Sequence, residues 1–245
     1  MMMKLIKMYL VFLLMLPMVN ASGQSSDTLL AYMDQLMSAP KDKEANVKIT
    51  LKNKAGKEKV REANMKQKGK DKKVYRYTKP EKQAGIATLS LPDGIMWLYM
   101  PAFGKATKIS LLSRSQAFNG TDFSYEDMNN TSYANRYIPS LIEDQESDFY
   151  VLDLVPKSKK SKYSHILIYL HKTEYYPIKM EYFNERGKKF KMASYTYAKA
   201  DGYWYAKEVV MTDLNKQHST TIQLTDLKFD QGIPDSVFTV EDLKQ

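Results

Sequence analysis

The eleven residues FNGTDFSYEDM, at positions 118–128, hold three acids, two hydroxyl side chains, three aromatic rings and one glycine. Carboxylates this close in sequence could act as a general acid and base, or could bind a metal ion. The acids are Asp122, Glu126 and Asp127, and the motif contains no His, Cys or Lys that would complete a catalytic pair with them. A structural role therefore competes with a catalytic one.

The spacing within the motif predicts the start of a helix. Ser124 and Asp127 stand three residues apart, as in a capping box, so Tyr125–Met128 is expected to form a short helix. Gly120 permits a backbone conformation that would penalise a side chain, and Asp122 can close an Asx-type turn onto nearby N–H groups.

We expect the aromatic rings to pin this loop against a sheet, so that the motif forms the lid of a pocket and does no chemistry itself. The expected lid residues are Phe118, Gly120, Thr121, Asp122, Phe123, Ser124, Tyr125, Glu126 and Asp127.

The histidines give little support for a catalytic or metal site elsewhere. His165 and His171 fall on one strand-like segment, about 20 Å apart if it is extended, which is too far to share a metal. His218 stands alone in the sequence. Acids outside the motif could complete a paired-carboxylate hydrolase, because a sequence gives no distances. We predict no enzyme activity, no metal and no cofactor, with a small-ligand enzyme as the alternative.

Residues 1–21 have the pattern of a cleaved signal peptide. Lys4 and Lys7 precede an apolar run too short to span a bilayer, and Val19-Asn20-Ala21 offers the small residues of a cleavage site. The alternative is a retained membrane anchor. We predict export to the periplasm, with a single mature domain over residues 22–245.

The absence of cysteine excludes disulfide bonds, thiol catalysis and thiolate metal sites. It also excludes lipid attachment through an N-terminal cysteine. A mature chain of this length can bury a large core without such staples, so we expect a soluble monomer.

Positive charge is concentrated early in the mature chain. The formal net charge is +9, and residues 41–73, from Lys41 to Lys73, hold thirteen basic and five acidic residues. The lysines cluster in turn-like stretches such as KNKAGKEK, which favours solvated hairpin tips. Transient contact with an anionic membrane surface or an acidic partner is the alternative. We expect no nucleic-acid partner, because no binding motif is present.

Hydrophobic periodicity predicts one helix and then many strands. In residues 26–38, Leu29, Leu30 and Met33 recur at helical spacing behind a Ser-Ser-Asp cap. From Val47 onwards apolar and polar residues alternate, as in a half-buried strand. Ten similar segments follow: KVYRYT, IATLSL, GIMWLYM, ATKISLL, FYVLDLV, SHILIYLH, PIKMEYF, KFKMASYTYA, YWYAKEVVM and HSTTIQLTDLKF.

Short separators such as LPDG and KADG predict antiparallel hairpins between these segments. The pattern breaks only between residues 111 and 147, where the motif lies. We expect a mainly β fold with one continuous antiparallel sheet of about eleven strands. Helix candidates at 26–38, in the insertion and at DSVFTVEDL are expected to cover its open side.

Three segments carry a resemblance to a known family: YTKPEKQAGIATLSLPDGIMWLYMPAFGKATKIS, FNGTDFSYEDM and GIPDSVFTVEDL. The chain resembles the LolA-like family of outer-membrane lipoprotein-sorting proteins, in the branch with a GTDFSYEDM-type signature. The resemblance implies a strongly curved, incomplete half-barrel with helices across its concave face, and a cavity that holds acyl chains. In one departure, Lys105-Ala106-Thr107-Lys108-Ile109 stands where the family often has several arginines, so no role for those arginines transfers.

Flexible thioethers and flat rings in the alternating segments are suited to line such a cavity. The sequence has 15 Met and 18 Tyr. Core packing is the alternative role for each side chain. The expected cavity residues are Met96, Trp97, Met100, Met180, Met192, Trp204 and Met211.

Taken together, the residues and the resemblance predict a periplasmic carrier for lipid or acylated lipoprotein cargo, with a membrane-bound donor or acceptor as partner. A small-ligand enzyme on the same fold, or an envelope sensor or interaction module, is the alternative.

Overall fold

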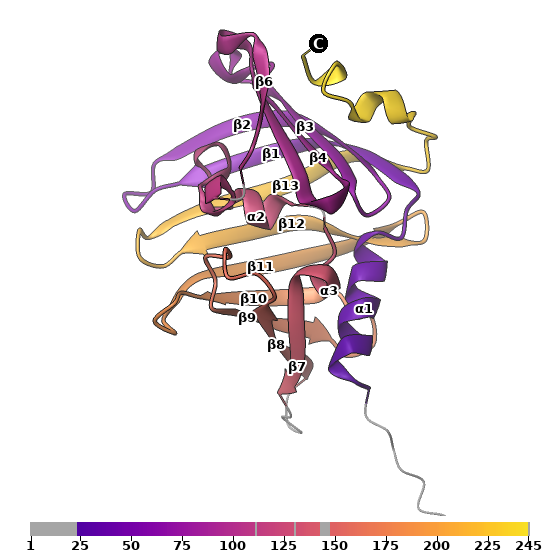
Figure 1. Ribbon diagram of the computed structural model, residues 1–245, viewed down its shortest axis with the longest axis vertical. Coiled ribbons are helices and arrows are strands. Elements are labelled where there is room, and N and C mark those ends of the chain that lie inside the picture. The colour runs from indigo at the N-terminus through magenta and orange to yellow at the C-terminus, as the bar shows by residue number, and fades with distance from the viewer. Residues whose placement is uncertain (1–23, 111, 130, 143–147, 245) are drawn as a thin grey trace, which may run out of the picture.

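The computed structural model describes residues 24–110, 112–129, 131–142 and 148–244 (Figure 1). The predicted signal peptide, residues 1–21, lies outside these ranges. No helix within them is both long and apolar enough to cross a bilayer.

The described residues form one antiparallel sheet of thirteen strands, in the order β6-β5-β4-β3-β2-β1-β13-β12-β11-β10-β9-β8-β7. Consecutive strands pair within β1–β6 and within β7–β13, and the pairing of β1 with β13 joins these two halves of the chain. The strands are β1 (Asp42–Lys52), β2 (Glu58–Lys68), β3 (Lys72–Lys79), β4 (Ala87–Leu91), β5 (Ile95–Met100), β6 (Lys105–Lys108), β7 (Tyr137–Ile142), β8 (Phe149–Pro156), β9 (His165–His171), β10 (Pro177–Phe183), β11 (Lys189–Ala200), β12 (Tyr203–Asp213) and β13 (His218–Phe229).

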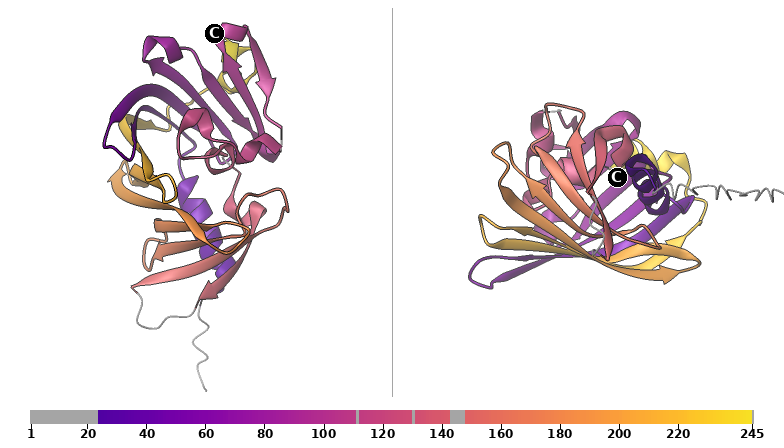
Figure 2. Two further views of the ribbon diagram at one scale, coloured as in Figure 1. Left: turned by 90° about the vertical axis from the view of Figure 1, so that its left-hand side faces the viewer. Right: turned by 90° about the horizontal axis from the view of Figure 1, so that it is seen from below.

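The sheet curls strongly but its two edge strands, β6 and β7, do not pair, so it forms the predicted half-barrel (Figure 2). Irregular register between Glu44 and Asn46 of β1, and between Thr196 and Tyr197 of β11, marks bulges. Bulges increase the local twist of a strand and so help a large sheet to bend.

Two of the thirteen strands were not among the eleven predicted. Strand β2 is rich in Lys and Glu, and its buried positions are Ala63, Met65 and Gln67 near its end. That pattern is too polar to stand out as alternation. Strand β7 contains Pro139 and lies inside the insertion, which obscured its period. Pro is tolerated there because β7 is an edge strand.

Three helices lie on the concave side of the sheet: α1 (Ser26–Met37), α2 (Tyr125–Met128) and α3 (Tyr133–Arg136). Helix α1 confirms the periodicity prediction, because Leu29, Leu30 and Met33 are fully buried against the main core. Its N-cap is Ser25, whose hydroxyl accepts a hydrogen bond from the N–H of Thr28 at 3.2 Å.

The C-terminal turns, Asp235–Phe238 and Asp242–Lys244, cover the opposite face of the sheet and not the open concave side. Phe238 and Leu243 pack there with Val74 and Leu89. Val74 precedes Tyr75, which is in the concave core, and neighbouring residues of a strand point to opposite faces. The expectation that this segment helps to form the lid was therefore wrong.

Candidate functional site

A cavity of about 550 Å³ lies between the concave sheet, α1 and the segment that carries α2 and α3. Its apolar lining includes Met65, Tyr75, Phe123, Met128, Tyr133, Tyr182, Tyr195, Ala206, Val209, Ile222 and Leu224. Its polar lining includes Asp34, Gln35, Ser38, Lys43, Gln67, Lys70, Lys73, Asp127, Asn129, Ser132 and Arg136. The volume is in the range of sites that bury most of a small ligand.

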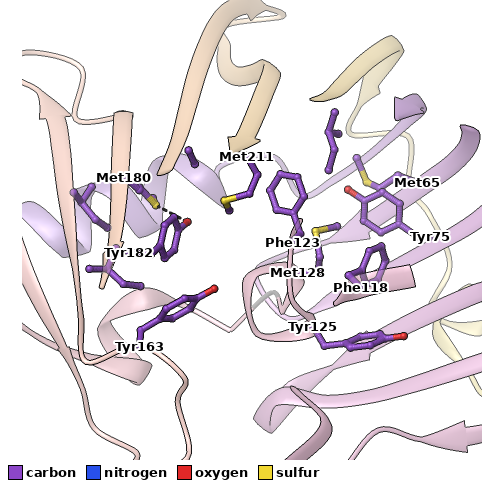
Figure 3. Packing of buried hydrophobic residues seen from close by; sticks show 14 of the residues in the cluster. Met65, Tyr75, Phe118, Phe123, Tyr125, Met128, Tyr163, Met180, Tyr182 and Met211 are labelled. Carbon is purple, nitrogen blue, oxygen red and sulfur yellow. Dashed lines mark hydrogen bonds between the residues drawn. The ribbon is translucent and has the colours of Figure 1, made fainter. Parts of the chain in front are cut away.

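The FNGTDFSYEDM motif forms one wall of this cavity. Phe123 and Met128 lie between the side chains of Met65 and Tyr75 on one side and Tyr182 on the other (Figure 3). Phe118 is buried behind them, edge-on to the rings of Tyr75 and Tyr125. The aromatic residues thus hold the loop against the sheet, as the sequence predicted.

The predicted capping box is present at α2. The Ser124 hydroxyl accepts from the N–H of Asp127 at 3.2 Å, and the Asp127 carboxylate accepts from the N–H of Ser124 at 2.7 Å. Tyr163 of the β8–β9 connection adds a hydroxyl donor to Asp127 at 2.7 Å. Gly120 has φ +72°, a conformation that side chains penalise, and so confirms the predicted turn.

Asp122 has different partners from the predicted Asx turn. Its buried carboxylate accepts from the Thr220 hydroxyl at 2.6 Å and lies 2.7 Å from Nδ1 of His218, both on β13. The N–H of Asp122 donates to the Thr220 hydroxyl, and Lys191 donates to the Asp122 carbonyl. The sequence could not reveal this cluster, because His218 is 96 residues away from Asp122.

Glu126, the third acid, is also bound by structural donors. Its carboxylate accepts from the Ser161 hydroxyl at 2.7 Å and the Tyr137 hydroxyl at 3.2 Å. Each acid of the motif therefore fixes the lid to another part of the fold. The described residues contain no group of three or more His, Asp or Glu placed to hold a metal ion.

Asp34 joins α1 to α3 at the edge of the cavity. Its two carboxylate oxygens accept from the N–H groups of Tyr133 and Ala134, each at 2.8 Å. Burial raises the pKa of Asp34, although these two N–H groups act in the opposite direction. The carboxylate lies at the start of α3, where exposed N–H groups favour an acceptor.

On the face of the sheet beneath the cavity, a row of residues with two lysines lies next to a row of apolar residues. Lys43 of β1 pairs with Gln67 of β2, and Gln67 pairs with Lys73 of β3, so these residues form one row across three strands. The next row on the same face is Ala45, Met65 and Tyr75.

Lys43 and Lys73, the two cations of this row, lie where water is partly excluded, and the charge of Arg136 on α3 acts on Lys73. Burial lowers the pKa of Lys43 to about 8. Burial, with the charges of Lys43 and Arg136, lowers the pKa of Lys73 to about 7. The Arg136 guanidinium stacks over the rings of Tyr133 and Tyr137, 4.5 and 5.3 Å from their centroids. This end of the cavity is thus positively charged at neutral pH and below.

None of the seven cavity residues expected from the sequence is in the lining. Met96 and Met211 are buried in the concave core, and Met100 is half-buried at the end of β5. Trp97 packs in the cluster on the opposite face. Met192 also points away from the cavity, because its neighbours Lys191 and Ala193 are buried on the concave side.

Met180 supports the lining from behind. Its sulfur accepts hydrogen bonds from the hydroxyls of Tyr133, Tyr182 and Tyr195, at 3.6, 3.5 and 3.3 Å. Trp204 is tied to the far end of the sheet, where its indole N–H donates to Glu174 at 2.7 Å. The seven residues were predicted because they are Met or Trp. Which side chains reach the cavity depends instead on the face of the strand to which each one points and on the position of the lid.

The basic segment contains three groups of lysines with different surroundings. The β1–β2 turn carries exposed lysines, as predicted for solvated hairpin tips. Lys68 and Lys72 form ion pairs with Asp235, at 2.9 and 3.1 Å, and so hold the C-terminal segment. Lys43 and Lys73, together with Lys70, line the cavity. The last group was missed because its lysines were counted with the turns that flank them.

The lysine row makes the stability of the unliganded protein depend on pH. Lys73 has a folded-state pKa of about 7, below its ordinary value of 10.5. The unfolded chain therefore binds more protons between these values, so the free energy of unfolding rises as pH rises through them. From about pH 6 to about pH 9 the rise in the free energy of unfolding should be about 2–3 kcal/mol smaller in Lys73→Met than in the parent protein. Urea unfolding at the two pH values measures it, and equal rises would contradict the burial of this charge.

Three solved structures are similar to this chain over about nine tenths of its length. A putative outer membrane lipoprotein-sorting protein domain from Vibrio parahaemolyticus has 26% identity and a TM-score of 0.83, covering 90% of this chain and 98% of its own. A DUF1329 family protein from Desulfovibrio piger has 23% identity and a TM-score of 0.82, covering 89% and 97%. A LolA superfamily protein from Nitrosomonas europaea has 21% identity and a TM-score of 0.75, covering 89% and 98%.

A family model described as "-like: Uncharacterized protein" matches residues 69–245. No protein with a curated description matches the sequence. The structural neighbours therefore carry the comparison, and those below 25% identity establish the fold alone.

Proposed function

The chain belongs to the family described as uncharacterized proteins that matches residues 69–245, and it has the LolA-like fold of outer-membrane lipoprotein-sorting proteins; from this we propose that it is a periplasmic carrier for lipid or acylated lipoprotein cargo. The observation that carries the proposal is the cavity of about 550 Å³ under the helical lid. The carrier has no enzyme activity and needs no cofactor.

The apolar lining supports this proposal on energetic grounds. An acyl chain gains about 0.8 kcal/mol for each methylene that leaves water for an apolar wall. Val209, Ile222 and Leu224 of the sheet, with Phe123 and Met128 of the lid, provide such a wall. Uptake then requires no chemical step, and release requires only an acceptor that binds the chain more tightly.

The lid supports reversible uptake because it is built from a short loop. Helices α2 and α3 have four residues each, so tertiary contacts hold them in place and not their own helical stability. Asp34 provides such a contact by accepting from the N–H of Tyr133, and Asp127 provides one by accepting from the hydroxyl of Tyr163. We expect the lid to open as one unit when these bonds break.

The proposal includes the location of the protein and its partners. Cleavage of residues 1–21 releases a soluble, monomeric mature domain, residues 22–245. A membrane-bound donor supplies the cargo and a membrane-bound acceptor receives it. Transient contact of the exposed β1–β2 lysines with an anionic membrane surface would assist delivery.

Native mass spectrometry tests this function directly. The protein is expressed with its signal peptide in its own envelope, purified without detergent, and measured intact and after gentle activation. We expect a monomer lacking residues 1–21 that carries an added mass, which fragments as a lipid or an acylated peptide. A mature protein that carries no lipid from its envelope, and takes up none from vesicles, would refute the carrier function.

A further inference from the structure

Resting on the proposed carrier function, we infer that the cargo is an amphiphile with an anionic head, a carboxylate or a phosphate, and that Lys43, Lys73 and Arg136 bind this head while the chain lies over the apolar rows of the sheet.

The register of the sheet brings the two lysines to one place. Lys43 and Lys73 flank Gln67 in one row, and neighbouring strands are about 4.8 Å apart, so their backbones are separated by about 10 Å. Both side chains are long enough to reach a single anion from this distance. The adjacent row of Ala45, Met65 and Tyr75 starts the apolar floor directly beside them.

The fold leaves part of the hydrogen-bonding capacity of these cations unused, although one Nη of Arg136 donates to the carbonyl of Glu126 at 3.2 Å. Among the described residues, the ammonium groups of Lys43 and Lys73 make no ion pair or hydrogen bond, and that of Lys73 lies 5.8 Å from the centroid of the Tyr75 ring. Within the same part of the chain, Nε of Arg136 is buried without a hydrogen-bond partner. Buried polar groups of a folded protein are nearly always paired, so Nε of Arg136 indicates a missing acceptor, and the half-buried Lys43 and Lys73 lie where they can bind the same group.

The acids of the cavity do not supply that acceptor. Asp34 gives both oxygens to the backbone of α3, and Asp127 accepts from Ser124 and Tyr163. Even without Lys70, which makes an interaction of its own, the cationic side chains Lys43, Lys73 and Arg136 of the described lining outnumber these two carboxylates. An anionic head would restore the balance, whereas a neutral head would leave it unchanged.

Protonation of the row links binding to pH. The charged and titratable groups that face the lysines are Asp34 of α1, Lys70 of the β2–β3 turn, Asp127 of α2, Arg136 and Tyr133 of α3, and Tyr75 of β3. Burial lowers the pKa of both lysines, to about 8 for Lys43 and about 7 for Lys73. An anion favours their charged forms, so it binds with proton uptake and more tightly below about pH 7.

Calorimetric titration with three ligands of equal chain length tests the inference. Decanoate and decyl phosphate are anionic, and decanol is neutral. Lys43→Met and Lys73→Met keep the side-chain length but remove the charge. Lys66→Met is the matched control, because Lys66 lies on β2 beside Gln67 and therefore points to the opposite face. Melting temperatures of all variants establish that they are folded.

We expect each cavity variant to bind the anions about tenfold more weakly, the usual effect of losing one charge-assisted contact, and to bind decanol unchanged. The parent protein should lose affinity for decanoate, whose own charge is constant in this range, from about pH 6 to about pH 9 but keep its affinity for decanol. If the lysine substitutions weaken binding of decanoate alone, or of decyl phosphate alone, the result supports the inference and identifies the head group.

Equal binding of all three ligands, with no effect of Lys43→Met or Lys73→Met, would overturn the anionic head group and leave the carrier function standing. Failure of the folded parent protein to bind any of the three would overturn both.

Discussion

Replacement of Ala206 by tryptophan is expected to weaken acyl-chain uptake about 100-fold without unfolding the protein. Ala206 is half-buried on β12, and its side chain lines the cavity. An indole ring there would occupy part of the 550 Å³ and exclude about four methylenes of a bound chain. The loss is about 3 kcal/mol of binding free energy, which corresponds to about 100-fold in Kd. Displacement of a fluorescent fatty acid measures it.

The matched control for this change is Ala198→Trp. Ala198 is half-buried on β11, next to Tyr197, which pairs with Ala206. It points to the opposite face of the sheet and should leave affinity unchanged. If both variants kept the parent affinity and melting temperature, the ligand would not occupy this cavity and the carrier function would lose its main support.

Removal of the Asp122 carboxylate is expected to have the largest effect on stability. Asp122→Ala leaves the Thr220 hydroxyl and Nδ1 of His218 without their acceptor, and Thr220 is fully buried. The cost is about 3 kcal/mol, because unpaired buried polar groups keep their full desolvation penalty. For a chain of this size the melting temperature should fall by about 6–12 °C.

A double-mutant cycle separates this network from a catalytic role. Thr220→Val replaces the second partner by an apolar group of the same shape, so adding it to Asp122→Ala should cost less than the sum of the two single changes. Gly120→Ala should cost only about 1 kcal/mol, through its positive φ, because a Cβ there meets nothing closer than Arg61 at 3.9 Å. An unaltered melting temperature in Asp122→Ala would contradict the lid account.

Local patterns in the sequence were sufficient to predict the helices and strands that depend on interactions between residues close in the chain. The period of Leu29, Leu30 and Met33 identified α1, and the spacing of Ser124 and Asp127 identified the capping box of α2. Both depend on residues within one or two helical turns of each other. Alternation likewise identified eleven strands, because most of them bury one face whatever their neighbours are.

Segments in which polar and apolar residues do not alternate clearly could not be assigned correctly from the sequence. Strand β2 exposes most of its Lys and Glu residues, and only its pairing with β1 and β3 makes it a central strand. Its backbone hydrogen bonds, and not its composition, fix its place. The C-terminal turns were assigned to the wrong face for a similar reason, because the period of a short segment does not say which apolar surface it will cover.

The site itself was decided by tertiary structure. The sequence by itself determined that aromatic residues would hold a carboxylate-rich loop against the sheet, and that apolar side chains would be available for a cavity. Only the register of β1, β2 and β3 brought Lys43, Gln67 and Lys73 into one row, and only the approach of the lid to β13 placed Asp122 beside His218. Register and lid position depend on pairings between residues far apart in the chain, which no local pattern specifies.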